Sequence, residues 1–245
     1  SYNGISYQNT EIKGQIAENI FSCKIMNQSY ENEFFADAIL DFQNEKTSIS
    51  VTSDIQKLNF KFNPEDSSKT TLACKGDFKL IGNSFEELDG QINLEYLNYT
   101  FDHKQFPFNH FKISKTSSKE RQDIKVISDE FELSISGDYF PNELPLIAQK
   151  LIQRIDQKDQ LSIDSNILSR DIDLTLKVSK NSPIVSQFVD NLSLESGFFS
   201  LNYNIETENI SSNHNIVGLR FENISAPHII ANIQNEQDSK ALNFN

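Results

Sequence analysis

The chain has 245 residues, of which 37% are apolar, and its formal net charge is −13. This charge and the absence of any dense lysine or arginine cluster argue against nucleic acid and anionic membrane surfaces as partners, because both need a concentrated basic face. No stretch approaches the ~20 consecutive apolar residues of a membrane-spanning helix.

Apolar and polar residues alternate along most of the chain, which predicts β-strands with one apolar and one polar face. In the segment from Glu33 to Phe42, for example, Phe34 and Phe42 fall on the apolar side. Further alternating segments lie at residues 58–62, 92–96, 111–113, 131–135, 172–178 and 199–205. Short polar segments rich in Asn, Asp and Ser separate them, so we predict an antiparallel meander.

Two segments have the period of a helix instead of a strand. The first predicted helix spans residues 141–157 and begins at a proline. Its apolar residues are Leu144, Ile147, Leu151 and Ile155. The second spans residues 183–191, again with a proline at its first position, and Ile184 and Phe188 lie on its apolar side. We expect both helices to plug the apolar face of the sheet where two runs of strands meet.

These helices suggest how the chain is organised. We expect a β-sheet segment at residues 1–140, the plug helix at residues 141–157, and a further sheet repeat at residues 165–245 that contains the second helix. Each helix follows a strand, a polar stretch and a proline, which indicates an internal repeat of roughly 45–50 residues. An unclosed sheet of ~15 strands would extend about 70 Å, and open sheets of that width curl or split. The predicted fold is therefore all-β: a long curled antiparallel sheet, open as a groove, with two short amphipathic helices.

Several of these segments carry a family likeness. The run SISGDYFPNELPLIAQKLIQRI resembles a segment of the TamB proteins of Bacteroidota-type bacteria, where a strand ending in Ser-Gly leads through a proline to a short helix. RDIDLTLKVSKNSPIVSQFVDNLSLESGFFSLNYN is similar to the next unit of that family, and GQINLEYLNYTF looks like one of its strands. The resemblance covers most of the chain from Ile39 to the end, on patterns and not on catalytic signatures.

The resemblance implies an internal fragment of a long periplasmic protein of the AsmA-like, bridge-like lipid transfer group. Such a protein is anchored in the inner membrane of a Gram-negative envelope and forms a β-taco, a taco-shaped sheet with an apolar trough. It works with a BamA-superfamily outer-membrane barrel through regions outside this chain. The implied role is to carry phospholipid between the two membranes and support outer-membrane biogenesis. The alternative is a chaperone-like module for the assembly or secretion of outer-membrane proteins.

The apolar side chains of the strands have two interpretations: they line a trough for acyl chains, or they fill the core of a closed barrel or sandwich. The lipid-groove candidates are Phe34, Phe42, Phe60, Phe62, Phe131, Leu133, Ile135, Leu174, Leu176, Phe199 and Leu201. A buried methylene contributes roughly 0.8 kcal/mol, so an acyl chain of about fourteen carbons gains about 10 kcal/mol without a polar contact. Alternation alone does not separate the two interpretations, because a sandwich shows the same pattern.

No group of residues has the spacing of an active site, so we expect no enzyme activity, no cofactor and no metal. His103 and His110 flank a predicted hairpin, but no carboxylate at ligand spacing accompanies them. Cys23 and Cys74 are either small buried residues or a disulfide pair. A purely structural β-solenoid or adhesin-type scaffold remains a third class of function beside lipid transport and strand binding.

Overall fold

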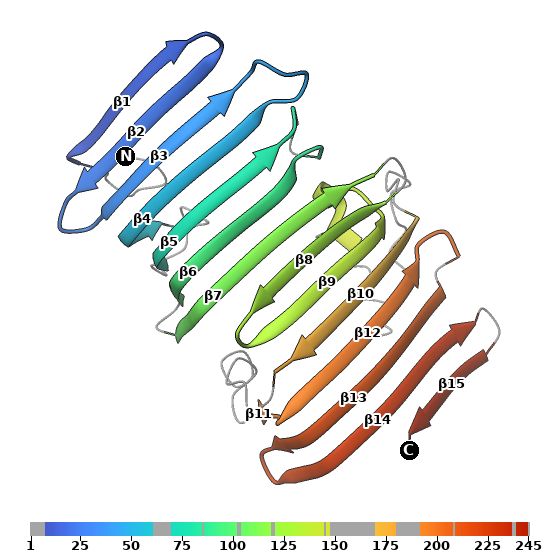
Figure 1. The fold of residues 1–245 in the computed structure, drawn as a ribbon. Coiled ribbons are helices and arrows are strands. Elements are labelled where there is room, and N and C mark those ends of the chain that lie inside the picture. The colour runs from blue at the N-terminus through green and yellow to red at the C-terminus, as the bar shows by residue number, and fades with distance from the viewer. Residues whose placement is uncertain are drawn as a thin grey trace.

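A computed structural model describes residues 8–60, 70–84, 86–101, 104–118, 121–144, 146–147, 170–179, 192–207, 209–236 and 239–244. Within these ranges the protein is one antiparallel sheet in which fourteen strands lie side by side in chain order (Figure 1). A short extra strand, β11 (Leu192–Ser193), lies off this path and pairs with β13. The prediction of an all-β antiparallel meander is confirmed.

The first seven strands are β1 (Thr10–Ala17), β2 (Ile20–Gln28), β3 (Glu33–Asp41), β4 (Ser48–Phe60), β5 (Thr70–Ile81), β6 (Asp89–Phe101) and β7 (Lys104–Ser117). The remaining strands of the path are β8 (Gln122–Ser128), β9 (Phe131–Asp138), β10 (Asp171–Val178), β12 (Ser196–Asn204), β13 (Asn209–Phe221), β14 (Ile224–Glu236) and β15 (Ser239–Phe244). Tight hairpins join most neighbours, as the short polar segments between the alternating stretches predict.

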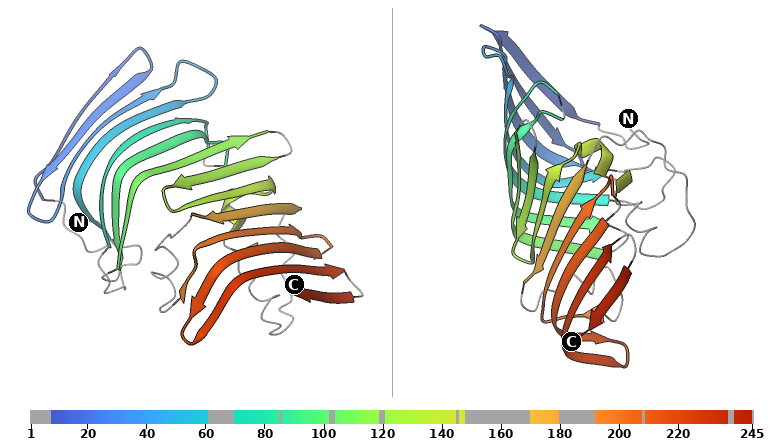
Figure 2. Two further views of the ribbon diagram at one scale, coloured as in Figure 1. Left: turned by 60° about the horizontal axis from the view of Figure 1, so that its bottom comes forward. Right: turned by 90° about the vertical axis from the view of Figure 1, so that its right-hand side faces the viewer.

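The sheet is open, with β1 and β15 at opposite ends (Figure 1). Its strands twist and bow, but in the described residues the sheet neither closes nor curls strongly on itself (Figure 2). The accessible surface is 16279 Å², whereas a compact protein of 28.0 kDa exposes about 11,000 Å². The sheet is therefore a single layer, which rules out the sandwich and barrel interpretations for this part of the chain. The strong curl that the sequence predicts is not found.

Irregularities on neighbouring strands bend the first half of the sheet. The register between β4 and β5 shifts between Ile55 and Leu58, and that between β5 and β6 shifts between Ala73 and Lys75. Opposite the second shift, Tyr96 in β6 has a φ of 52°, a left-handed conformation that is uncommon outside glycine. Bulges of this kind increase the local twist and bend the strand. The middle strands of this half arch visibly in Figure 2.

Little helix is present. A 3₁₀ turn, η1 (Pro141–Glu143), is followed by helical backbone at Leu144, Leu146 and Ile147. The beginning of the first predicted helix is thus found, in part as 3₁₀. Its later residues, Leu151 and Ile155, lie outside the described residues, as do the whole of the second predicted helix and its Ile184 and Phe188. None of the helical backbone that the structure describes is long and apolar enough to cross a membrane.

Candidate lipid-facing surface

Residues directly opposite each other in an antiparallel sheet project to the same face, so the register defines rows of side chains across the strands. Two rows cross the thirteen strands of the path from β1 to β14, and we call them row A and row B. Row A contains Ile16, Phe21, Leu40, Ile49, Leu80, Gly90, Lys115, Ile124, Ile135, Leu174, Leu201, Ser212 and Ile233. Row B contains Gly14, Cys23, Ala38, Val51, Phe78, Ile92, Ile113, Val126, Leu133, Leu176, Phe199, His214 and Ala231. Both rows belong to one face, the apolar face, which is almost without charge.

The register brings most of the predicted groove residues together on the apolar face. Row A contains three of them (Ile135, Leu174 and Leu201) and row B another three (Leu133, Leu176 and Phe199). Phe34, Phe60 and Phe131 lie on the same face outside these rows. Phe42 follows the end of β3 and is 50% exposed, so the strand register does not assign it to either row. Phe62 lies outside the described residues.

Aromatic side chains pack side by side where β5, β6, β7 and β9 meet this face. Cys74, Leu97, Phe106 and Phe108 are buried there, with Phe131 packed against them. The ring centroids of Phe108 and Phe131 are 6.2 Å apart in an edge-on arrangement. Burial, and secondarily the nearby Asp54 charge, raises the pKa of the Cys74 thiol. This part of the face is a filled apolar layer one sheet thick, not an empty trough.

Cys23 and Cys74 are both buried and free. Cys23 lies in row B on β2, three strands away from Cys74 on β5. The interpretation of the two cysteines as small buried residues is confirmed, and the disulfide alternative is wrong.

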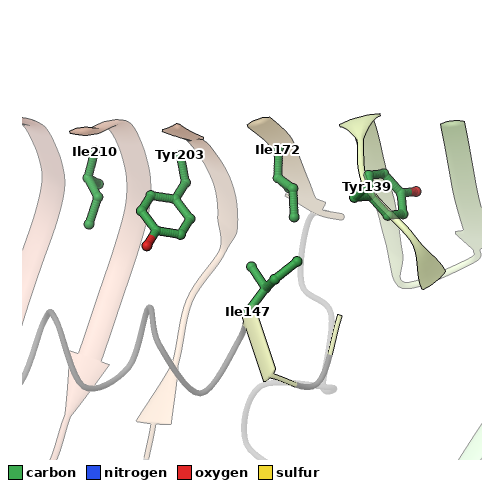
Figure 3. Packing of buried hydrophobic residues seen from close by; sticks show 5 residues of the cluster. All are labelled: Tyr139, Ile147, Ile172, Tyr203 and Ile210. Atoms are coloured by element: carbon green, nitrogen blue, oxygen red, sulfur yellow. The ribbon is translucent and has the colours of Figure 1, made fainter. Parts of the chain in front are cut away.

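A second apolar cluster lies on β10, β12 and β13. Ile147 is 2% exposed and points from the short helical segment toward Tyr139, Ile172, Tyr203 and Ile210 (Figure 3). The Tyr139 hydroxyl donates to the Ile135 carbonyl oxygen at 3.2 Å, and burial, with a smaller effect of Asp123, raises its pKa to about 12. Ile147, with Leu144 beside it, therefore covers the apolar face at this point.

Among the described residues, row A and row B contain polar side chains at two places only. At the first, Lys115 is held by hydrogen bonds from its Nζ to the carbonyl oxygens of Glu86 at 2.7 Å and Leu88 at 2.9 Å, and burial lowers its pKa. At the second, His214 lies beside Ser212 on β13. Motif-based reasoning overlooked His214, although the alternation Ile210, Ser212, His214, Ile216 places it on the apolar side.

The opposite face of the sheet carries the charges. Lys24 and Asp37 pair at 3.3 Å across β2 and β3, and Lys125 and Glu132 pair at 2.8 Å across β8 and β9. The hydrogen bond from Lys125 is the main reason that the pKa of Glu132 is lowered. A contiguous apolar face of this extent marks a surface that binds another molecule or another part of a protein.

The edge strand β1 is a separate exposed surface. All eight of its residues are exposed, including Ile12 at 66% and Ile16 at 78%. Among the described residues it pairs only with β2, so it forms one edge of the sheet, and the edge of a sheet is where another strand can add.

The part of the chain that the structure describes contains no set of three His, Cys, Asp or Glu side chains that could hold a metal ion. His103 lies outside the described residues, and His110 is exposed. Searches against protein-family models, curated proteins and solved structures gave no match. The geometry of the apolar face is therefore the main guide to function.

Proposed function

We propose that this chain is a segment of a periplasmic bridge that carries phospholipid between the inner and outer membranes and supports outer-membrane biogenesis. The resemblance to TamB motifs supports a location in a Gram-negative envelope, and in this proposal the membrane anchor and the contact with a BamA-family barrel belong to other parts of the protein. The single observation that supports the proposal most is the continuity of row A and row B. Along these rows hydrocarbon would contact apolar side chains on most strands, with Lys115 on β7 and the pair Ser212 and His214 on β13 as the polar interruptions.

The energetics indicate what the sheet must do to hold a lipid. Full burial of an acyl chain of about fourteen carbons is worth about 10 kcal/mol, but an open face covers only one side of it, or about 5 kcal/mol. Association costs at least about 4 kcal/mol in lost freedom. A flat face would thus hold lipid only weakly. In this proposal the sheet bends around its cargo into the groove of a β-taco, and the short helix from Pro141 limits that groove at the second cluster.

Co-purifying lipid tests the proposal directly. The protein should be purified without detergent and its organic extract analysed by mass spectrometry, with phospholipid in a reproducible molar ratio as the expected result. A matched pair of variants on β10 makes the test specific. Leu176→Gln alters row B, whereas Thr175→Gln alters the adjacent residue, which projects to the opposite face. We expect Leu176→Gln to lose lipid and Thr175→Gln to keep it. Equal retention by both would contradict the proposal.

A second candidate function rests on β1. Its exposed backbone edge suits the addition of an extended strand, which is how a chaperone-like module would bind unfolded outer-membrane proteins. A purified protein that is free of lipid and binds extended β-strand peptides, and loses that binding in Ile12→Pro, would favour this function. A protein that binds neither lipid nor peptide would favour a structural scaffold.

A further inference from the structure

A polar pair interrupts the apolar face where row A and row B cross β13. Ser212 is 5% exposed in row A, and the half-buried His214 follows in row B between Phe199 and Ala231. His214 Nε2 lies 3.1 Å from Ser212 Oγ. The other ring nitrogen, Nδ1, is enclosed and has no hydrogen-bond partner. The pair is therefore only partly satisfied by the protein.

The surroundings of His214 are otherwise apolar. The Phe199 ring lies 5.7 Å from the imidazole, centroid to centroid. On its own strand the imidazole has Ser212 and Ile216 beside it. On the flanking strands β12 and β14 its neighbours are Gly197, Phe199, Leu201, Ile229, Ala231 and Ile233. None of these residues is charged, and burial alone lowers the pKa of His214.

When the imidazole is protonated, its Nε2–H donates to Ser212 Oγ, so the Ser212 hydroxyl proton needs an acceptor outside the pair. A buried hydroxyl without an acceptor lowers stability, and a partner that accepts from it restores the lost free energy. We propose that His214 and Ser212 bind the oxyanion of an acidic amphiphile whose hydrocarbon chain lies along row A and row B. The Ser212 hydroxyl donates to a carboxylate or phosphate oxygen, the imidazolium Nε2–H donates to Ser212 Oγ, and none of the described residues that flank His214 is a carboxylate that would compete. This site rests on the proposed function and adds to it a point at which a head group is held.

Because the anion pairs best with a protonated imidazole, binding should strengthen as the pH falls through the pKa of His214. The test uses the full chain and three probes that share one hydrocarbon chain: dodecanoate, dodecyl phosphate and dodecanol, each below its critical micelle concentration. Their displacement of the neutral dye Nile red gives the affinity. At about pH 5.5 we expect both anions to bind about ten-fold more tightly than the alcohol, and at about pH 8 this ratio should shrink.

Two variants test whether the preference for anions comes from His214 and Ser212. His214→Phe should bind all three probes alike, with its affinity for dodecanol unchanged, and Ser212→Ala should lose part of the preference for anions. Circular dichroism checks that each variant is folded. If His214→Phe does not fold, Ser212→Ala alone tests the assignment. Inorganic phosphate serves as the control for a free anion.

The possible outcomes distinguish a failure of the head-group site from a failure of the proposed lipid-binding function. Equal affinity for all three probes in the wild type, or a preference for anions that survives both variants, overturns the head-group site and leaves the proposed function standing. Displacement by none of the probes overturns both. Competition by inorganic phosphate as strong as that by dodecyl phosphate assigns the pair to free phosphate and overturns the amphiphile.

Discussion

The rings of Phe108 and Phe131 pack at 78° to each other although they belong to β7 and β9, which are separated by β8. The contact is possible because the intervening strand ends in a small residue, Ser128, which pairs with Phe111 and whose Oγ accepts from the Phe131 N–H at 3.0 Å. Phe111 also lies 6.3 Å from Phe131. Three aromatic rings thus meet over a serine, and a single layer of sheet acquires a local core.

We expect Phe131→Ala to lower the free energy of unfolding by about 2 kcal/mol, because it removes two edge-on ring contacts and part of a buried cluster. Urea denaturation followed by circular dichroism measures the change. Phe198→Ala is the matched control, since that ring lies on the charged face and is 37% exposed. A loss of similar size in the control would mean that the two faces do not differ in packing.

Gly76 leaves room for the neighbouring Phe78 ring on the apolar face. A methyl group at Gly76 would come within 2.6 Å of Phe78 Cε2 and 2.7 Å of Ser53 Oγ. We expect Gly76→Ala to cost about 1–2 kcal/mol through overpacking. In a double-mutant cycle with Phe78→Leu, the cost of the alanine should fall to less than half. If the unfolding free-energy changes of Gly76→Ala and Phe78→Leu simply add, the Phe78 ring does not require a glycine at position 76.

Lys115 secures the hairpin loop between β5 and β6 against the apolar face. Its Nζ donates to the Glu86 and Leu88 carbonyl oxygens, and its side chain is 15% exposed. We expect Lys115→Met to cost about 1–3 kcal/mol because both carbonyls lose their donor. Hydrogen exchange should accelerate in residues 86–88. Lys112→Met, an exposed position on the same strand, is the control and should change neither measurement.

Much of this surface follows from alternation. A period of two is sufficient to assign Leu133, Leu176 and Phe199 to one face, because it determines the side to which each residue projects. It does not determine the number of layers, which depends on long-range pairing. Phe42 shows a second limit. The pattern continues through it, but the Gln43 N–H donates to Asp41 Oδ1 at 2.8 Å, a local turn that ends the strand.

The bends and the polar pair were harder to predict. The register shift between Ile55 and Leu58 leaves no mark on the sequence, because the residues after it resume alternation. His214 carries no motif, and its significance comes from the strands on either side. A histidine at an apolar position of an alternating strand indicates a polar site on the apolar face, and such positions can be found by comparing each histidine with the alternation around it.

The pH dependence of stability tests the environment of His214. Burial lowers its pKa in the folded state below the ordinary value of 6.5, so near and below that pH the unfolded state binds more protons. The free energy of unfolding should therefore fall as the pH decreases from about 7 to about 5, by about 1.4 kcal/mol for each unit by which the pKa is lowered. His214→Leu should remove this slope, whereas the exposed His228→Gln should retain it. Urea titrations at several pH values measure both. A slope that persists in His214→Leu would show that the imidazole is not desolvated on the apolar face.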